Sequence, residues 1–350
     1  MSSVPQTQKA WIVTRRGKPS ESLSLEQNDP VPTKLAPGEI LVKVQAAAMN
    51  PVGYHMMGMW PNFVAKRPHV AENDFTGIVV DANGTELQNG QAVYGVILVP
   101  LQFKTHQGAL AQYTRVPASV VVPRPPGMTP TEAAGLSLAG LTAYQALFTV
   151  AKLRPGQNLF INGGSTAVGI FAIQLAKAIG CTVTASASGK REDLLHSLGV
   201  DHFVDYTKGR VHEQLERNHL NPKFDVMFEA VGVTDVELWT HSASYLAPGG
   251  TYASVGMWPG EDGYARMFRY MWETIRPAWL GGTKRKWKLV VVSTDDRGDI
   301  EKFAQCVKDG QVKVVIDSVY SFEDVPKAYE RIMSSRAAGK IIIKVDPSAE

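Results

Sequence analysis

The sequence predicts an α/β protein in which a small β-barrel precedes a parallel sheet covered by helices on both faces. Two observations support this fold class. The first part of the chain contains short apolar or alternating stretches separated by turn signals, and from Leu159 onward strand and helix patterns alternate. Between these parts, Pro123–Gly127 interrupts both patterns, so we place a domain boundary there.

The strands expected in the first part are bounded by residues that favour turns, namely Pro37-Gly38, Asn83-Gly84 and Asn89-Gly90. These strands are Ala10–Thr14, Glu39–Ala47, Gly77–Ala82 and Gln91–Leu98. After the boundary, Thr131–Phe148 has helical periodicity, and Thr129 or Thr131 is suited to cap that helix.

The alternation in the second part predicts a parallel sheet, because parallel strands are joined by helical crossovers. The expected elements are strands Leu159–Asn162, Thr182–Ser186, Phe203–Asp205, Phe224–Glu229 and Thr251–Val255, with helices Val168–Ile179 and Arg191–Leu198. The tail adds helices Asp299–Lys308 and Val325–Ser334 and strands Val314–Val319 and Lys340–Val345.

Composition indicates a globular protein with two domains of ordinary size, because 350 residues with 44% hydrophobic content can bury sizeable cores. Basic and acidic residues are interspersed apart from Lys284–Lys286, which argues against a nucleic-acid partner. The start, Met1–Lys9, is polar and no apolar run is long enough for a bilayer, so we expect a cytoplasmic protein without a membrane segment. Cys181 and Cys306 are too few for a disulfide framework or a cysteine-rich zinc site.

The segment Asn158–Gly169 joins an apolar strand to a helix through small residues. Gly163 and Gly164 permit a tight turn, and Gly169 lets the helix pack closely on the strand. Backbone N–H groups from Ser165 to Val168 would lie at the positive end of the helix dipole, where a pyrophosphate can bind. Thr166 and Ala167 stand where glycines are common, so the segment alone fits a nicotinamide enzyme and a sheet that binds nothing about equally well.

Taken together, eight motifs resemble the medium-chain dehydrogenase/reductase superfamily, in its zinc-independent branch of quinone oxidoreductases and enoyl reductases. The motifs are Ala48–Tyr54, Asn73–Gly77, Asn89–Gly95, Gly108–Tyr113, Ala133–Leu147, Gly163–Gly169, Phe224–Gly232 and Gly339-Lys340. The resemblance implies a GroES-like β-barrel catalytic domain at 1–126 and 297–350, and a Rossmann NADP-binding domain with a doubly wound parallel sheet at 127–296. The active site would lie in the cleft. The insertion Glu261–Trp287 looks most like that of fungal members.

Charge after the second strand of the parallel sheet favours NADPH over NADH. No carboxylate follows that strand before Glu192, whereas Lys190 and Arg191 suit the extra phosphate of NADPH or, alternatively, are only a solvated helix start. The resemblance implies that Tyr206 approaches the adenosine phosphate. Further cofactor positions implied by it are Asn50, Thr142, Gly164, Ser165, Thr166, Ala167, Val168, Gly169, Ser188, Val231, Gly232, Val255, Gly256, Gly339 and Lys340.

The zinc-dependent members of the superfamily carry Cys and His ligands at positions where this chain has Met49-Asn50 and Glu72–Asp74. The histidines His55, His69 and His106 are expected in loops of different motifs. We therefore expect a mechanism without metal, which disfavours alcohol oxidation because nothing polarises the alcohol oxygen.

The resemblance implies reduction of a conjugated C=C bond or a quinone. Asn50 and Tyr54 are the catalytic candidates, in a loop facing the nicotinamide. Asn50 would hydrogen-bond the cofactor or the substrate oxygen, and Tyr54 or His55 would supply or orient a proton unless solvent provides it. Gly53 stands where the family often has Asp, so a polar contact from that side chain is absent.

Met- and Trp-rich segments predict an apolar pocket for a hydrophobic small molecule. The candidate substrate residues are Met57, Trp60, Met257 and Trp258. Trp272 and Trp279 fit the wall of this pocket and, at least as well, buried packing or dimer contacts. A quinone, a small enone and a fatty or polyketide acyl thioester are all compatible acceptors.

Other functions stay open: a carbonyl reductase, a trans-acting enoyl reductase of a polyketide synthase, and a non-catalytic NADPH-binding protein. The resemblance also allows a homodimer through Lys288–Ser293, as well as a monomer.

Overall fold

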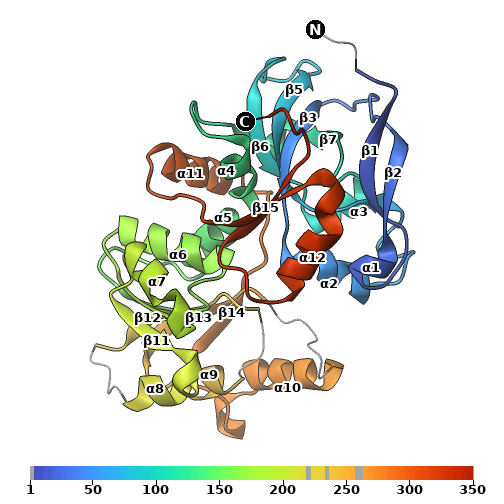
Figure 1. Cartoon of the computed structure of the whole chain (residues 1–350). Coiled ribbons are helices and arrows are strands. Elements are labelled where there is room, and N and C mark those ends of the chain that lie inside the picture. The colour runs from blue at the N-terminus through green and yellow to red at the C-terminus, as the bar shows by residue number, and fades with distance from the viewer. Residues whose placement is uncertain (1–3, 218–221, 233–235, 257–262, 350) are drawn as a thin grey trace. The chain divides into compact units, whose positions relative to one another are not determined.

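The computed structural model describes residues 4–217, 222–232, 236–256 and 263–349. They form two compact units (Figure 1). Unit 1 comprises Met1–Leu138, Ser293–Lys308 and Lys313–Glu350, and unit 2 comprises Ala139–Val292 and Asp309–Val312. No helix in the described ranges is long and apolar enough to cross a membrane.

Unit 1 is built on a seven-stranded sheet in the order β15-β16-β3-β5-β6-β8, with β7 also paired to β3, and on a three-stranded sheet in the order β2-β1-β4. The strands are β1 Thr7–Val13, β2 Leu23–Pro30, β3 Glu39–Ala48, β4 His69–Val70, β5 Asp74–Asp81, β6 Ala92–Val96, β7 Tyr113–Pro117, β8 Val121–Pro123, β15 Ile316–Ser321 and β16 Lys340–Lys344. Strand β16 pairs antiparallel with β3, so the end of the chain completes the N-terminal sheet.

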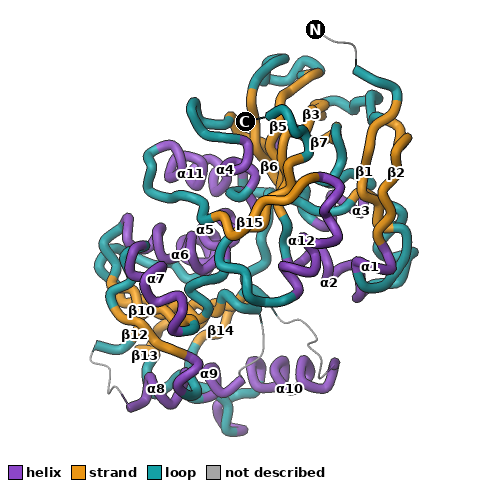
Figure 2. Tube along the Cα trace, viewed as in Figure 1, coloured by secondary structure: helices purple, strands orange, loops and turns teal. Residues whose placement is uncertain are grey.

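The helices of unit 1 are mostly short (Figure 2). They are α1 Pro19–Ser22, α2 Pro51–Met59, α3 Val99–Thr105, α4 Pro130–Ala134, α11 Arg297–Lys308 and α12 Val325–Met333, with 3₁₀ turns at Ala118–Val120 and Phe322–Asp324. Helix α2 corrects the expectation of a loop around Asn50 and Tyr54. This helix could not be predicted from the sequence, because the helix contains two glycines and buries only Met57 and therefore lacks an apolar stripe.

Unit 2 contains a six-stranded parallel sheet in the order β11-β10-β9-β12-β13-β14. Its strands are β9 Asn158–Asn162, β10 Thr182–Ala187, β11 His202–Asp205, β12 Phe224–Glu229, β13 Leu246–Ser254 and β14 Lys286–Leu289. The chain places β10 and β11 on one side of β9 and β12 to β14 on the other, so the strand order reverses between β9 and β12. Right-handed crossovers on the two sides of that reversal put helices on opposite faces. This is the doubly wound Rossmann arrangement, as expected.

The helices of this part of the chain precede the sheet or connect its strands. They are α5 Ser137–Tyr144, α6 Ala167–Ala178, α7 Glu192–Ser197, α8 Val211–Arg217, α9 Val236–Thr240 and α10 Gly263–Ile275, with a π-helical turn at Gln145–Val150 and 3₁₀ turns at Gly189–Arg191, Tyr206–Lys208 and Ala278–Leu280.

The single helix expected at Thr131–Phe148 is divided into α4, α5 and the π-helical turn, because Gly135 ends α4. Thr129 is the cap of α4: its hydroxyl oxygen accepts a hydrogen bond from the Glu132 N–H, and the Glu132 carboxylate accepts one from the Thr129 N–H. Helix α4 packs on β3 and β5, which is why unit 1 extends to Leu138, beyond the boundary expected at 126.

Candidate active site

The carboxyl ends of the parallel strands lie at one edge of the sheet in unit 2, and predicted cofactor residues follow them. These segments are Gly163–Gly169 after β9, Ser188–Arg191 after β10, Tyr206 after β11, Val231-Gly232 after β12 and Val255-Gly256 after β13. Thr142 lies in α5 and is 9% exposed. The fold thus brings the turns that flank a Rossmann cofactor to one edge, although they are scattered in sequence.

The turn between β9 and α6 is tightly built. Gly163 has a φ of +83°, and a Cβ at Gly169 would overlap the carbonyl oxygen of Gly163, so both positions require glycine. Thr166 caps α6: its hydroxyl oxygen accepts from the Gly169 N–H at 3.0 Å and donates to the Gly163 carbonyl at 2.8 Å. The amides of Ala167 and Val168 precede the first hydrogen bonds of the helix, so this end fits a pyrophosphate.

A buried polar network supports this turn. Asn162 donates to Glu229 at 2.7 Å and accepts from the Ser186 hydroxyl at 2.6 Å. Ser186 in turn accepts from the Gly163 N–H, and Glu229 accepts from the Val231 N–H. Sequence analysis assigned no role to these three side chains, although a polar residue at the end of a buried strand was the available signal.

The end of the dinucleotide site that would hold the adenosine carries exposed basic and aromatic groups. Lys190 is exposed and Tyr206 is 55% exposed. The fold also brings in a carboxylate that the local sequence does not contain, since Asp205 lies against Gly189. The Asp205 side chain is only 7% exposed and accepts hydrogen bonds from the hydroxyl and N–H of Thr207, which lower its pKa.

In unit 1, Lys340 is at the centre of a buried polar cluster. Its ammonium donates to Asn50 Oδ1 at 2.7 Å, Asp74 Oδ2 at 2.9 Å and the Met49 carbonyl at 3.2 Å. Asn50 uses both amide hydrogens, donating to Asp74 Oδ2 and the Ala48 carbonyl. Because the three donors of the Lys340 ammonium are all engaged, it supports Asn50. The cofactor contact expected of Gly339 and Lys340 stays a prediction.

Glu72 extends this cluster to the start of α2. It is 1% exposed and accepts hydrogen bonds from the Asn50 N–H at 3.1 Å and from the Tyr329 hydroxyl at 2.7 Å. Burial raises the pKa of Glu72 to about 7, although the Tyr329 hydroxyl, the Lys340 charge and the Asn50 N–H oppose the shift. Sequence analysis considered Glu72 only as a position where zinc ligands are missing, and it did not single out Tyr329.

The donor set does not fit zinc. Within the described residues, no three His, Cys, Asp or Glu side chains gather as metal ligands. Glu72 and Asp74 accept hydrogen bonds from protein donors, and the Lys340 ammonium beside Asp74 would repel a metal cation.

The expectation that the three histidines lie in loops is wrong for two of them, because His55 lies in α2 and His69 in β4. His106 is the C-cap residue of α3. Burial lowers the pKa values of His55 and His69 to about 4, so both rings are neutral at physiological pH.

Helix α2 presents Tyr54 half-buried, with its ring centroid 4.2 Å from that of His55. Burial raises the Tyr54 pKa, so the phenol keeps its proton at neutral pH. Of the predicted substrate residues, Trp60 is 41% exposed whereas Met57 is 2% exposed and belongs to the core of unit 1. Met257 and Trp258 lie outside the described residues.

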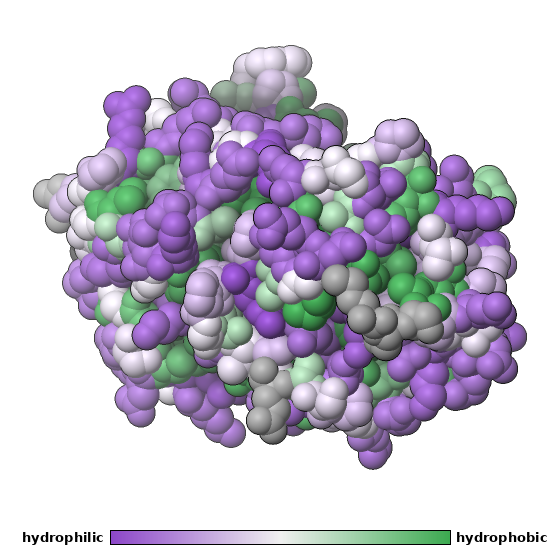
Figure 3. All heavy atoms as spheres, turned by 90° about the horizontal axis from the view of Figure 1, so that it is seen from above, coloured by the Kyte–Doolittle hydropathy of each residue, from purple (hydrophilic) through white to green (hydrophobic). Residues whose placement is uncertain are grey.

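Helix α10 carries an apolar face formed by Phe268, Met271, Trp272 and Ile275, which are 40% to 70% exposed. Their spacing of three and four residues aligns them on one side of the helix. The nearby Trp279 is 82% exposed, so burial of Trp272 and Trp279 within unit 2, one of the alternatives above, is wrong. On the molecular face shown in Figure 3, by contrast, hydrophilic residues dominate and apolar ones form separate patches.

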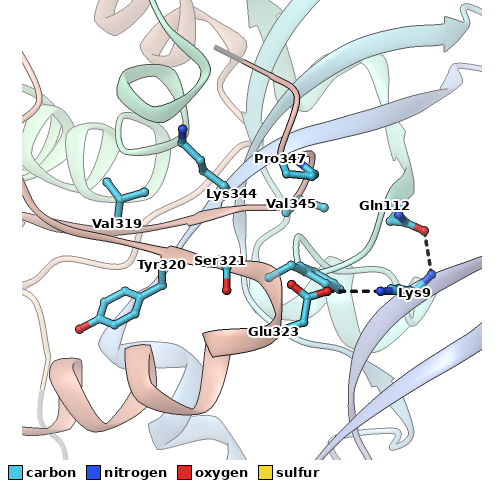
Figure 4. A pocket seen from close by; sticks show the side chains of 10 residues that line it. Lys9, Gln112, Val319, Tyr320, Ser321, Glu323, Lys344, Val345 and Pro347 are labelled. Carbon is cyan, nitrogen blue, oxygen red and sulfur yellow. Dashed lines mark hydrogen bonds and ion pairs between the residues drawn. The ribbon is translucent and has the colours of Figure 1, made fainter.

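A hollow of about 370 Å³ in unit 1 contains none of the predicted site residues. It lies beside β15 and is bordered by the ion pair between Lys9 and Glu323 at 3.3 Å (Figure 4). Val319 and Tyr320 supply its apolar wall. We do not assign it to the reaction.

Known proteins match the chain over nearly its whole length, and two family models match parts of it. The family described as "Alcohol dehydrogenase GroES-like domain" matches residues 36–126, and "Zinc-binding dehydrogenase" matches residues 198–343. The trans-enoyl reductase pgmF of Aspergillus terreus is 36% identical, covering 100% of this chain and 99% of that protein. The 2-methylene-furan-3-one reductase of Solanum lycopersicum is 31% identical over 99% of this chain and 81% of its own.

The fold has solved counterparts. The quinone oxidoreductase from Coxiella burnetii superposes with a TM-score of 0.79 at 23% identity, covering 97% of this chain and 99% of that one. One matching family name mentions zinc, whereas the donor set found among the described residues does not fit that metal.

Proposed function

Because this chain belongs to the medium-chain dehydrogenase/reductase superfamily, in its branch of enoyl reductases and quinone oxidoreductases, we propose that it reduces a conjugated C=C bond or a quinone with NADPH and without metal. The whole-length similarity to a trans-enoyl reductase carries the proposal. A second reductase that matches 99% of this chain, the 2-methylene-furan-3-one reductase of Solanum lycopersicum, supports the same reaction type.

The choice of NADPH rests on charge. Lys190 and Arg191 follow β10, and Tyr206 follows β11, so a cationic and aromatic edge is available to a ribose phosphate. The carboxylate of Asp205 is buried, and its Oδ1 already accepts two hydrogen bonds from Thr207, which leaves it fewer acceptor sites for ribose hydroxyls.

When bound, the dinucleotide supplies the hydride. The remaining tasks belong to the protein: amides at the start of α6 hold the pyrophosphate, and a donor near the substrate oxygen stabilises the developing enolate or hydroquinone. We assign that donor to Tyr54, because its phenol stays protonated and no described residue hydrogen-bonds its hydroxyl. Asn50, whose amide hydrogens are engaged, supports the start of the helix that carries Tyr54. Solvent is the alternative proton source.

The acceptor is proposed to be a hydrophobic small molecule. In unit 1, Trp60 is exposed and suits such a ligand. In unit 2, the apolar face of α10 is exposed as well, and Met257 and Trp258 keep the substrate role that the sequence predicts for them. A cytoplasmic location and a homodimer through the edge strand β14 are also proposed, the latter because Leu289 at the end of β14 and Val291 just after it are 43% and 71% exposed.

The test is to mix the purified protein with NADPH or NADH and either a small enone or a quinone, following loss of nicotinamide absorbance and the product mass. We expect NADPH-selective formation of the saturated ketone or the hydroquinone. Tyr54→Phe should lower kcat by about tenfold if the phenol donates to the substrate oxygen. NADPH binding without oxidation by any acceptor would instead favour the non-catalytic alternative.

A trans-acting enoyl reductase is the second candidate, favoured by the likeness to pgmF over the whole chain. It predicts activity on an enoyl chain attached to a carrier protein and little on the same enoyl group as a simple thioester. Comparing the two substrates at equal concentration separates the candidates.

A further inference from the structure

The start of helix α2 lacks a local capping side chain. Asn50 is the residue before the helix, Pro51 is its first residue, and Gly53 is therefore the third. In a capping box, the side chain at this third position reaches back to the N–H of the residue before the helix. Gly53 has no side chain, and the Asn50 side chain makes no capping bond of its own.

Glu72 makes the missing contact from outside the helix. Its Oε2 accepts from the Asn50 N–H at 3.1 Å although the two residues are 22 positions apart. A Cβ on Gly53 would overlap Glu72 Oε1, so the carboxylate lies in the space that a side chain at 53 would fill. The same Oε1 accepts from the Tyr329 hydroxyl at 2.7 Å, which ties α2 to α12.

The backbone at Glu72 adopts a conformation that is unfavourable for a residue with a side chain. Its φ of +62° is in the left-handed region, which glycine tolerates and other residues adopt at a cost of roughly 1–2 kcal/mol. Buried contacts must offset that cost. Among the described residues, the carboxylate of Glu72 accepts hydrogen bonds only from Asn50 and Tyr329.

We propose that Glu72, in the turn before β5, is a positioning residue whose carboxylate caps the start of α2. The missing side chain at Gly53 leaves the room that this carboxylate occupies. Glu72 thereby fixes the helix start that presents Tyr54, with Asn50 held in addition by Asp74 and Lys340. The role rests on the proposed function, because it matters for catalysis only if Tyr54 faces the acceptor.

The sharpest test exchanges the two residues. Glu72→Gly removes the carboxylate, Gly53→Glu adds a second one in occupied space, and the double variant returns a single carboxylate to the third helical position. We expect each single change to lower kcat by about tenfold or more, because small misplacements of a catalytic group have effects of this size. The double variant should recover to within about threefold of the parent.

Two matched controls accompany the exchange. Gly58→Glu adds the same side chain to the same helix at a position where a Cβ meets nothing within 4 Å. Glu86→Gln removes a carboxylate whose side chain is 79% exposed. Both should keep kcat within about twofold, since surface changes away from such contacts have small effects. The KM for NADPH should stay unchanged in every variant that folds.

Hydrogen exchange at the start of α2 provides a readout that does not need turnover. The Asn50 amide should exchange faster in Glu72→Gly and regain protection in the double variant. If the parent reduces no acceptor while this exchange pattern appears, the proposed function fails and the capping role stands. If activity is present but the Asn50 amide exchanges no faster in Glu72→Gly than in the parent, the capping role is overturned alone.

Glu72→Gln decides the matter if the glycine variant does not fold. A Gln side chain keeps the volume but has one acceptor oxygen for two donors, the Asn50 N–H and the Tyr329 hydroxyl. The pH profile of the parent kcat should show an inflection near pH 7, where Glu72 titrates, and the Gln variant should lose that inflection. The groups that face Glu72 are Tyr329 of α12, Lys340 of β16 and Asp74 of β5. An unchanged kcat and pH profile in Glu72→Gln would exclude the positioning role.

Discussion

At the scale of single residues, Glu72 gives the protein a pH dependence of stability with a defined sign. Its pKa is raised from 4.5 in the unfolded chain to about 7 in the folded one. The folded state therefore binds the proton more tightly, and the associated stability is complete below pH 4.5 and lost as the pH rises through 7.

Glu72→Gln should remove this dependence. Between pH 5 and pH 8, the parent should lose about 2 kcal/mol of unfolding free energy relative to the variant. Urea unfolding of both proteins at the two pH values measures the difference. A constant difference across that range would mean that the carboxyl group is not held in a raised-pKa state.

The basic pair after β10 makes a second prediction at this scale. Replacing Lys190 and Arg191 by Ala should weaken NADPH binding by about tenfold to a hundredfold and leave NADH binding nearly unchanged, because only NADPH has the extra phosphate. Fluorescence titration with both nucleotides checks this, with Lys284→Ala as the control. Equal weakening for the two nucleotides would remove the pair from phosphate recognition.

Residue-level roles were predictable where the chemistry is local. The glycines at 163 and 169 can be inferred from a few neighbouring residues, and the cap of α4 can be narrowed to Thr129 or Thr131, because a tight turn or a helix start needs specific residue types. The close approach of Glu72 to Gly53 is a contact between distant segments, so it cannot be predicted from the residues next to either position.

At the scale of elements, the capping box of α4 is directly testable. Thr129→Ala should lower the unfolding free energy by about 1 kcal/mol, because the Glu132 N–H loses its acceptor. Thr131→Ala should have a smaller effect, since Thr131 is not the cap residue. Thermal unfolding of the two variants distinguishes them, and equal losses would count against the cap.

Elements of the Rossmann sheet were predictable because buried parallel strands are continuous apolar runs with helical patterns between them. Helix α2 and the division of α4 from α5 were not. In α2 the apolar residues follow no helical stripe, and in the second case Gly135 ends a helix within an otherwise continuous periodic pattern.

At the scale of the whole molecule, unit 1 depends on residues from both ends of the chain. Strand β16 lies between β15 and β3 in the seven-stranded sheet, so its loss would expose the interior of that sheet. Deleting residues 336–350 should leave unit 1 sensitive to protease, whereas deleting 348–350 should not. A truncated protein with parent-like resistance across residues 4–138 would show that β16 is dispensable.

The domain plan was accessible from the sequence only through the resemblance, because strand patterns alone do not say which tail strand joins which sheet. Pairing of Ile342 with Ala48 is set by packing across nearly the full chain length. The fold confirms the barrel-like part and the doubly wound part. The residue at which unit 1 ends and unit 2 begins follows from the packing of α4 on β3 and β5.

The overlap between a side chain at 53 and the Glu72 carboxylate restricts the order in which substitutions can accumulate in a lineage. An intermediate with acidic residues at both positions would bury two crowded carboxylates, while one with glycine at both would only leave two donors unpaired. The route between an acidic residue at 53 and one at 72 therefore runs through the glycine pair. Descendants of such a lineage should carry glycine at one position whenever the other is acidic.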